Sequence, residues 1–373
     1  MKKILLAGGG SGGHIYPLVA IMEKIREIAE ESDIEISYIG PKSSFDNLFL
    51  DRGVTIHRIT SSKLRRYFDL RNFLDIPKFI YSIFEAWVKL FFIMPDIIFS
   101  KGGPGSLAVV IAAKFYFIPV VIHESDAVPS LTSRITGKLA RKIGVAFKKT
   151  AEHFPESKVF ISGNPIRKEL TQNWIRQDSG KNYIGFNHKE PMVFILGGSQ
   201  GSESINSFVL ENIDDLLNEF QIYHQVGPSN INDVKNYTNF HFSKNPKNES
   251  RYKVVGNLNA KDIKIAFNAA DLIISRAGAG AVFEIAFFQK PSILIPLPRS
   301  ANDHQKVNAY TYSKKGAAIV IEEQNLKGNI LLNQIKNILN NQENIKKMTE
   351  AAKKFSTPDS LNIILREILN IIN

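Results

Sequence analysis

Short apolar runs alternate with longer amphipathic stretches along the first half of the chain. Four of these runs predict strands: Ile4–Ala7, Ile34–Ile39, Ile97–Ser100 and Val120–His123. Three of them lack polar alternation, which is typical of buried parallel strands, whereas Ile34–Ile39 alternates and predicts a strand with one less covered face. Helical patterns over Pro17–Glu30 and Ser106–Phe117 lie between the runs. Strands separated by helices predict βαβ units in a doubly wound sheet.

The same pattern starts again in the second half. Met192–Leu196 predicts a strand, Gly197–Gly201 a glycine turn, and Ser204–Phe220 a helix. Further strands are predicted at Ile222–Val226, Tyr252–Val255, Leu272–Ser275 and Ser292–Pro296. The chain therefore reads as two Rossmann-like halves. The polar stretch Trp174–Glu190 is the expected linker, and Leu361–Ile372 is an amphipathic helix that suits either half.

Length and composition narrow the class of protein. A chain of 373 residues is too long for one ordinary core, so two domains are expected. There are no cysteines, which excludes disulfides, thiolate zinc sites and a cysteine nucleophile and fits a reducing cytoplasm. A membrane span needs about 18 apolar residues. The nearest stretch, Phe79–Met94, is interrupted by Glu85 and Lys89, so no span is predicted.

The net charge of +11 indicates an anionic partner or a solvated basic surface. Two basic clusters lie in the first half: Arg58, Lys63, Arg65, Arg66 and Arg71, then Arg134, Lys138, Arg141, Lys142, Lys148 and Lys149. The candidates are nucleic acid, an anionic membrane and an anionic small ligand. We expect no nucleic acid, because the cations are not interleaved with aromatics on a known module.

The stretch GGGSGGHIYP follows the first predicted strand. Gly8, Gly10 and Gly13 match the G-x-G-x-x-G dinucleotide fingerprint, which also requires an acid at the end of the second strand. That strand ends in Gly40-Pro41-Lys42, without a carboxylate, which disfavours a nicotinamide dehydrogenase. What such a turn still offers is close backbone approach and a helix N-terminus that attracts anions.

Two later turns repeat the arrangement, at Gly197–Gly201 and Gly278–Gly280. Three such turns predict a diphosphate held between two domains, although any one of them could simply permit a tight turn. We expect Glu284 in the first turn of the helix after the third one. There it either accepts hydrogen bonds from ribose hydroxyls or complements the helix dipole.

His14 is the other candidate for chemistry. It follows the first glycine turn, where ligands bind in open α/β sheets. An imidazole there suits removal of a proton from a sugar hydroxyl. Hydrogen bonding to a phosphate, or capping of the turn, are the alternatives.

Together these motifs resemble the MurG family, the N-acetylglucosaminyltransferases that complete the lipid-linked peptidoglycan precursor. The resembling blocks span almost the whole chain: Gly8–Pro17, Lys63–Phe68, Ser100–Ser106 (SKGGPGS), His123–Ser130 (HESDAVPS), Gly163–Arg167 (GNPIR), Gly197–Gly201 (GGSQG), Ser275–Glu284 and Asp303–Ala309 (DHQKVNA). Two positions depart from the pattern. Asp126 stands where many members have asparagine, a form found in a subset of the family, and Ala281 stands where many have threonine or serine.

The resemblance implies an α/β GT-B fold, in which two Rossmann-like domains with parallel sheets face each other across a cleft. It implies an N-terminal acceptor domain over residues 1–163, with 350–373 returning to it, and a C-terminal domain over 164–349 that binds UDP-N-acetylglucosamine (UDP-GlcNAc). The implied acceptor is lipid I, undecaprenyl diphosphate carrying N-acetylmuramoyl-pentapeptide, and the product is lipid II. The implied reaction is an inverting transfer without a metal or other cofactor.

The resemblance also assigns residues. His14 matches the proposed general base, Glu284 would bind the ribose, and Gln305 the donor sugar. The remaining expected contacts to substrates are Ser11, Gly12, Gly13, Asp126, Arg167, Ser199, Gln200, Gly278, Ala279 and Gly280.

A lipid acceptor requires work at a bilayer surface. An apolar helical face fits this, rimmed by cations: Ile76, Phe79, Ile80, Ile83, Phe84 and Trp87. We therefore expect a peripheral protein at the cytoplasmic face of the cell membrane, with cell-wall synthesis proteins as partners; packing of this helix on the sheet is the alternative. Two other functions stay open: a GT-B enzyme with another lipid acceptor, such as diacylglycerol or a different polyisoprenyl diphosphate, and a non-catalytic nucleotide-sugar-binding partner.

Overall fold

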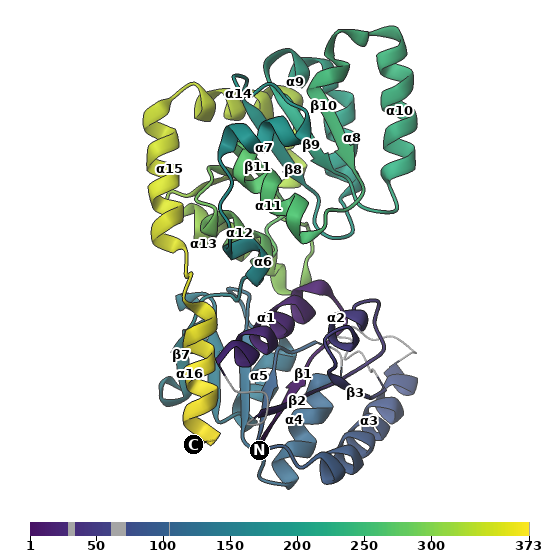
Figure 1. The fold of residues 1–373 in the computed structure, drawn as a ribbon, viewed down its shortest axis with the longest axis vertical. Helices are drawn as coiled ribbons and strands as arrows, with labels where there is room; N and C mark the ends of the chain where they lie inside the picture. The colour runs from purple at the N-terminus through teal and green to yellow at the C-terminus, as the bar shows by residue number, and fades with distance from the viewer. Residues whose placement is uncertain (29–33, 61–71, 104, 373) are drawn as a thin grey trace. The chain divides into compact units, whose positions relative to one another are not determined.

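The computed structural model describes residues 1–28, 34–60, 72–103 and 105–372. The chain forms two compact units: unit 1 is Met1–Arg167 with Pro358–Asn373, and unit 2 is Lys168–Thr357 (Figure 1). The sequence places the boundaries after residues 163 and 349. Each unit contains one parallel sheet covered by helices, which confirms the predicted pair of α/β domains.

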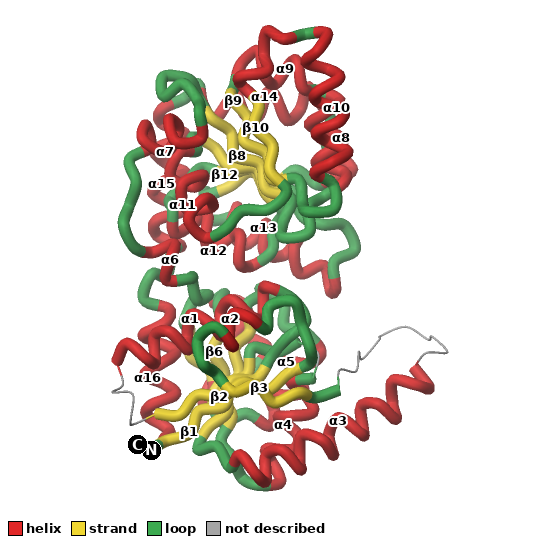
Figure 2. The backbone as a smooth tube through the Cα atoms, turned by 45° about the vertical axis from the view of Figure 1, so that its right-hand side comes forward, coloured by secondary structure: helices red, strands yellow, loops and turns green. Residues whose placement is uncertain are grey.

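The sheet of unit 1 has seven parallel strands in the order β3-β2-β1-β4-β5-β6-β7. Their bounds are β1 Lys2–Ala7, β2 Ile34–Gly40, β3 Thr55–Arg58, β4 Ile97–Ser100, β5 Val120–Glu124, β6 Lys142–Val145 and β7 Val159–Ile161. β1 lies inside the sheet, with Ile4 opposite Ile36 on one side and Ile97 on the other. Its apolar residues are buried because helices cover both faces of the sheet (Figure 2).

The helices of unit 1 are α1 Gly12–Ile28, α2 Asn47–Leu50, α3 Asn72–Ile93, α4 Ser106–Phe115, α5 Leu131–Leu139 and α16 Ser360–Ile372, with 3-10 turns at Lys148–His153 and Glu156–Lys158. The last helix, α16, packs with α1 on one face of the sheet, where Ile364 and Ile368 join the core around Ile15 and Leu18 (Figure 1). The opposite face is covered by α3 and α4, whose core residues include Leu90 and Val109.

The sheet of unit 2 has six parallel strands in the order β10-β9-β8-β11-β12-β13. Their bounds are β8 Met192–Leu196, β9 Gln221–Gln225, β10 Tyr252–Val255, β11 Leu272–Ser275, β12 Ser292–Leu294 and β13 Ala318–Val320. The helices are α6 Lys168–Thr171, α7 Gln177–Ile184, α8 Glu203–Glu211, α9 Ile213–Glu219, α10 Ile231–Lys244, α11 Ala260–Ala269, α12 Ala279–Phe287, α13 His304–Ser313, α14 Gly328–Leu339 and α15 Gln342–Phe355. Short 3-10 turns lie at Pro246–Arg251, Ala301–Asp303 and Glu323–Asn325.

Three predicted elements are wrong. The expected linker contains α7, which packs on α11 because Gly180 allows close approach to Ala269. The single helix expected over Ser204–Phe220 is two helices, α8 and α9, separated at Asn212. From Ile36 onward β2 is buried on both faces, with even Ser37 buried, because it lies inside the sheet between β1 and β3, and only Glu35 near its start is exposed.

In each sheet the strand order reverses beside the first strand of the unit. In unit 1 the chain passes from one side of β1 to the other at β4, and in unit 2 it does so between β8 and β11. Ligands of open α/β sheets bind at the carboxyl ends of strands beside such switch points. The glycine turns after β1, β8 and β11 all lie there.

Candidate active site

The first glycine turn connects β1 to α1 in unit 1. Gly9 and Gly10 have φ values of +147° and +96°, which glycine tolerates best. Helix α1 begins at Gly12, five residues before the predicted start, and Ser11 O accepts hydrogen bonds from the N–H groups of His14 and Ile15 at 3.0 and 3.2 Å. Ser11 and Gly13 are exposed, and Gly12 is buried under the ring of Tyr16. The turn therefore ends in the N-terminus of a long helix, a place that favours anions.

His14 lies in the first turn of α1, with its Nδ1 3.0 Å from Ser11 Oγ. The turn after β4 packs against the ring, because a Cβ on Gly103 would lie 3.2 Å from His14 Cγ. Burial and the positive charge of Lys101 lower the pKa of His14 to about 4, and the charge of Asp126 opposes them. His14 is therefore neutral at pH 7 and able to accept a proton.

Lys101, directly after β4, was missed by the sequence reasoning. Its ammonium donates hydrogen bonds to His123 Nδ1 at 2.8 Å and to Ser125 Oγ, and Ser125 Oγ donates to Asn164 Oδ1 at 2.8 Å. His123 Nε2 lies 2.9 Å from the carbonyl oxygen of Gly163. This network connects the ends of β4 and β5 to the segment after β7 that carries the GNPIR motif.

Asp126 lies in the loop after β5, two residues beyond Glu124. The buried Glu124 carboxylate accepts hydrogen bonds from the N–H groups of Asp126 at 3.0 Å and Ser130 at 3.1 Å, which fixes the loop. Burial and the charge of Asp126 raise the pKa of Glu124. Asp126 itself is half-buried.

Arg167, at the end of unit 1, is half-buried, and its guanidinium carbon lies 4.7 Å from the centre of the Tyr16 ring. Tyr16 in turn meets Phe45 edge to face. This cation–π contact holds Arg167 over α1 at Tyr16, which follows His14 by two residues. Nothing in the spacing of the sequence indicated Tyr16 as its partner.

The second glycine turn, between β8 and α8, exposes Ser199 and Gln200. Gly198 and Gly201 have φ values of +88° and +81°, and a Cβ on Gly201 would lie 2.0 Å from Val226 O, so this turn requires glycine. Ser202 caps α8 by accepting a hydrogen bond from the N–H of Ile205.

The third turn, between β11 and α12, is open above its glycines. A Cβ on Gly278 or Gly280 would have no neighbour within 4 Å, and Ala279 is buried beneath them. Gly278 is the N-cap residue of α12 and has no side chain to bond the first N–H groups of the helix. This surface can receive an anionic group.

Glu284 does not lie in the first turn of α12, as expected, but in the second, because the helix already begins at Ala279. The helix-dipole alternative therefore loses support, since that effect falls off within the first turn. Glu284 is half-buried.

Two further side chains, Arg276 and Gln305, form hydrogen bonds that hold the loops near the glycine turns of unit 2. The buried Arg276 donates to Ser202 Oγ at 2.6 Å and pairs with Glu323, so it ties the second turn to the third. Gln305, in the first turn of α13, accepts a hydrogen bond from the N–H of Leu297 at 3.1 Å through its Oε1. Arg276 was visible in the SRAGAG stretch, but its bonding partners, such as Ser202 and Glu323, come from distant segments of the chain.

Chemically, unit 1 offers a neutral imidazole beside buried charges, and unit 2 offers helix N-termini of α8 and α12 with a carboxylate nearby. Within the residues that the structure describes, no three His, Asp or Glu side chains lie close enough to hold a metal ion. The arrangement suits proton transfer in unit 1 and binding of a diphosphate in unit 2.

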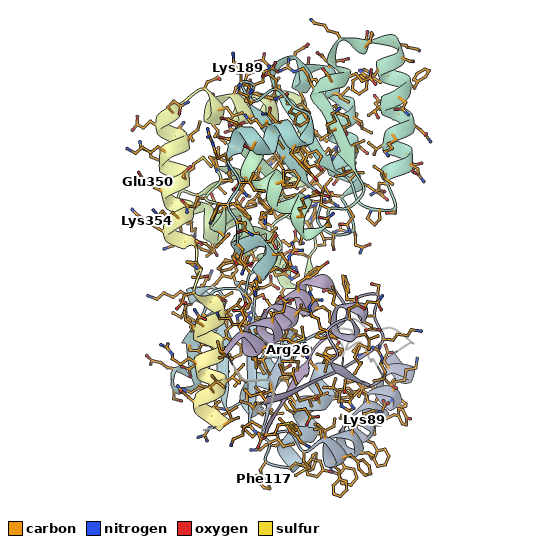
Figure 3. All side chains as sticks on the ribbon, viewed as in Figure 1. Arg26, Lys89, Phe117, Lys189, Glu350 and Lys354 are labelled. Carbon is orange, nitrogen blue, oxygen red and sulfur yellow. The ribbon has the colours of Figure 1, made fainter. Side chains whose placement is uncertain are left out.

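Helix α3 presents an apolar face to solvent. Of the predicted face, Ile76, Ile80, Phe84 and Trp87 are exposed, whereas Phe79 and Ile83 are half-buried. Additional exposed apolar side chains on or beside α3 are Tyr81, Phe91, Phe92, Met94, Phe115 and Phe117. Phe117 projects away from the ribbon (Figure 3) and is 87% exposed. The predicted cations Lys63, Arg65, Arg66 and Arg71 lie outside the described residues.

Comparison with known proteins gives the class first. The glycosyltransferase family 28 N-terminal domain matches residues 4–145, and the family 28 C-terminal domain matches residues 192–362. These two domains define a glycosyltransferase.

Curated relatives give the particular family. A UDP-N-acetylglucosamine--N-acetylmuramyl-(pentapeptide) pyrophosphoryl-undecaprenol N-acetylglucosamine transferase of Bacillus cereus is 34% identical over 370 residues, covering 99% of both chains. The enzyme of that name from Clostridium tetani is also 34% identical, covering 97% of both. The chain therefore belongs to this transferase family, the MurG family, and the predicted resemblance is confirmed.

Solved structures agree on the fold. MurG of Acinetobacter baumannii matches with a TM-score of 0.75 at 23% identity, over 99% of this chain and 100% of that one. A UDP-GlcNAc 2-epimerase of Neisseria meningitidis, bound to UDP-GlcNAc, matches with a TM-score of 0.68 at 13% identity, over 99% and 100% of the two chains.

Proposed function

We propose that this glycosyltransferase moves N-acetylglucosamine from UDP-GlcNAc to the C4 hydroxyl of the N-acetylmuramoyl-pentapeptide of lipid I, giving lipid II for peptidoglycan synthesis. The observation that carries the proposal is the full-length match to transferases whose names state this donor and acceptor. All three glycine turns lie within the matched domains.

His14 is the general base of the proposed reaction. For Nε2 to accept the hydroxyl proton, Nδ1–H must donate to Ser11 Oγ, and their 3.0 Å separation allows this hydrogen bond. The oxygen then attacks the anomeric carbon opposite the leaving diphosphate, so that an α-linked donor gives a β-linked product. The bond from the anomeric carbon to UDP breaks, and UDP leaves with its electron pair.

The donor binds to unit 2. The N-terminal N–H groups of α8 and α12 face the diphosphate and stabilise the charge that develops as UDP leaves, and Arg167 adds a cation. Glu284 accepts hydrogen bonds from the ribose, Gln305 contacts the sugar, and Ser199 and Gln200 contact the nucleotide. Fixed helix dipoles supply this stabilisation without a metal, so turnover should persist in the presence of a chelator.

The enzyme docks on the cytoplasmic face of the membrane through the exposed face of α3. In the described part of the chain, no helix combines the length and apolarity needed to cross a bilayer. The exposed aromatics of α3, the neighbouring Phe115 and Phe117, and exposed cations such as Lys78 and Lys114 support docking on anionic lipid.

Docking is tested by sedimentation with anionic liposomes at low salt. Replacing Phe84 and Trp87 together by serine should reduce the bound fraction several-fold, because each ring buries apolar area in the interface. Replacing Tyr237 and Phe240 by serine is the matched control, since these exposed aromatics lie on α10 of unit 2. Equal loss in both variants, or no binding by the wild-type chain, refutes docking through α3.

The activity is tested by incubating the protein with radiolabelled UDP-GlcNAc and a short-chain lipid I analogue. Label in the lipid fraction is the expected result. Label transferred only to diacylglycerol or to another polyisoprenyl diphosphate would replace the acceptor. Donor binding without transfer to any acceptor would indicate a non-catalytic nucleotide-sugar-binding protein.

A further inference from the structure

Arg276, which directly follows β11, bonds to three other segments of unit 2. Its Nη2 donates hydrogen bonds to Ser202 Oγ at 2.6 Å and to Ser204 Oγ at 2.9 Å, at the start of α8. Its Nη1 donates to the carbonyl oxygen of Ile295, after β12, at 3.3 Å. Nη2 also pairs with the carboxylate of Glu323, beyond β13. One side chain thus joins the segments that follow four adjacent strands of the sheet, β8, β11, β12 and β13.

Glu323 supplies the negative charge that balances this guanidinium. In the part of the chain that the structure describes, it is the only carboxylate within ion-pair distance of Arg276. Arg276 is 7% exposed and Glu323 is half-buried, and salt screens such a pair less than it screens a surface pair. Loss of the carboxylate charge would therefore leave a buried cation uncompensated, which is costly.

Two serine hydroxyls connect the ion pair to α8. A guanidinium can only donate, so both hydroxyl oxygens accept from Arg276. Ser204 then donates its own proton to Glu323 Oε2, at 2.7 Å. Ser202 is the N-cap residue of α8 and also accepts from the N–H of Ile205 at 3.4 Å. The first turn of α8 is therefore attached to the ion pair through two side chains.

The glycine turn between β11 and α12 has few side chains to hold it. A Cβ on Gly278 would meet no atom within 4 Å, and this N-cap residue of α12 makes no side-chain hydrogen bond. At the base of the turn, Asn308 Nδ2 donates to the carbonyl oxygen of Ala277 at 3.1 Å. Beside it, Arg276 holds the chain to the start of α8. The position of the α12 N-terminus relative to that of α8 therefore depends on the contacts of Arg276.

We propose that Glu323 is a positioning residue of the donor site. By orienting Arg276, it fixes the spacing between the N-termini of α8 and α12, whose N–H groups hold the diphosphate. Donors that are fixed in advance need no rearrangement when charge develops on the leaving group. The inference rests on the proposed function, in which UDP-GlcNAc binds at these two helices. Glu323 lies beyond Asp303–Ala309, the last of the sequence blocks that mark the family.

Glu323→Gln tests the charge, because glutamine keeps the length of the side chain and an oxygen that accepts hydrogen bonds. Affinity for UDP, measured by titration calorimetry, should fall roughly tenfold, within the range found for residues that act on a site through others. Affinity for uridine, measured by competition with UDP, should change little, because uridine lacks the diphosphate. The donor KM should rise by a similar factor as the UDP affinity falls, with the acceptor KM unchanged. Glu323→Asp keeps the charge and should lose less UDP affinity than Glu323→Gln.

Glu190→Gln is the matched control. Glu190 pairs with Arg251 at 2.8 Å, and its carboxylate is partly exposed like that of Glu323. Glu190 lies just before β8 and Arg251 just before β10, so this pair is at the edge of the sheet opposite the glycine turns. The substitution removes the same charge from an ion pair of the same unit. It should leave affinity for UDP unchanged, whatever it does to the free energy of unfolding in urea.

A double-mutant cycle with Ser204→Ala tests whether Glu323 acts through the start of α8. Both substitutions break the same attachment of α8 to Arg276. The double variant should therefore lose less UDP affinity than the product of the two single losses. A loss equal to the product would show that the two side chains act independently and would contradict the inference.

The inference is also overturned by unchanged UDP affinity in Glu323→Gln, by an equal loss for UDP and uridine, or by an equal loss in Glu190→Gln. If Glu323→Gln does not fold, Ser204→Ala carries the test: it should weaken UDP binding severalfold and spare uridine, and unchanged UDP binding refutes the role of Glu323. If the wild-type chain binds UDP but transfers no sugar, the proposed function fails, whereas calorimetry still decides the role of Glu323. If it binds no UDP, the donor site and the inference fail together.

Discussion

The turns after β1 in unit 1 and after β11 in unit 2 have the same design and different surroundings. Each follows a buried central strand, contains glycines and leads into the N-terminus of a helix at a switch point of its sheet. Around the first turn lie His14 and the buried groups Lys101, His123 and Glu124. Beside the turn after β11, the charged side chains Arg276 and Glu323 form an ion pair with each other.

The different surroundings of the two turns suit two different functions, proton transfer and anion binding. Buried titratable groups shift each other's pKa values, which suits proton transfer, whereas backbone N–H groups hold an anion without changing their protonation. The glycines differ in the same way. Gly103 is packed against Gly9 and His14, whereas Gly278 and Gly280 border open space. The proposed reaction accordingly assigns proton transfer to the turn in unit 1 and binding of the diphosphate to the turn in unit 2.

The largest effect is expected at His14. His14→Ala should reduce kcat roughly 10²–10⁴-fold, because the attacking hydroxyl loses its base, with donor affinity little changed. Steady-state kinetics with the lipid I analogue measure the first quantity and titration calorimetry the second. Ser11→Ala is the milder control, since it removes only the 3.0 Å contact to Nδ1. Near-normal turnover in His14→Ala removes His14 from the mechanism.

Substitution of Glu284 should affect donor affinity more than kcat, the opposite of the result expected for His14. Glu284→Ala should weaken UDP-GlcNAc binding roughly 10- to 100-fold, the value of one or two hydrogen bonds to a charged group, and slow chemistry less. Glu350→Ala is the control, because that exposed carboxylate lies on α15 of the same unit, outside the proposed donor site. Equal calorimetric affinities for Glu284→Ala and the wild-type chain would leave Glu284 with no role in the donor site.

Alanine substitutions of one glycine near each turn allow a direct comparison of the two turns. Gly280→Ala should raise the donor KM about tenfold by filling the space a phosphate needs, while stability rises by about 0.5–1 kcal/mol. Gly103→Ala should instead destabilise the protein by roughly 1–3 kcal/mol, because φ is +89° and the Cβ would lie 2.3 Å from Gly9 O. Urea unfolding and donor kinetics on both variants check this, and a swap of the two outcomes contradicts it.

The smallest effect is the pH dependence of the wild-type chain near neutrality. Since burial and Lys101 lower the pKa of His14 to about 4, the base stays deprotonated from pH 8 down to about pH 5. Turnover should then fall as the pH drops through about 4, where His14 gains a proton. A profile of kcat/KM measures it, and a limb near 6.5 would show that His14 is not held as described.

The sequence predicted much of the fold because apolar runs mark buried strands. β4, β8, β10 and β11 have the predicted bounds. The sequence-based prediction failed where packing contacts, rather than the pattern of apolar residues, determine the local structure. α7 is polar and was read as a linker, but it is held by Gly180 against α11. α1 starts within the glycines because its first turn rests on Ser11 O.

Within the site, the sequence indicated the glycine turns, His14 and Glu284, which stand next to recognisable strand ends. It missed Lys101, Tyr16 and Arg276, whose roles depend on partners far away in the chain. One signal was available for Lys101. A cation placed directly between a buried strand and a glycine turn lies at the carboxyl end of that strand, where ligands bind.

The division of work between the two turns is tested most directly by a crystal structure of the protein with UDP-GlcNAc. The account predicts the ribose hydroxyls within hydrogen-bond distance of Glu284 and the diphosphate at the N-terminus of α12. A nucleotide whose base and ribose instead occupy the Gly8–Gly13 turn would contradict it.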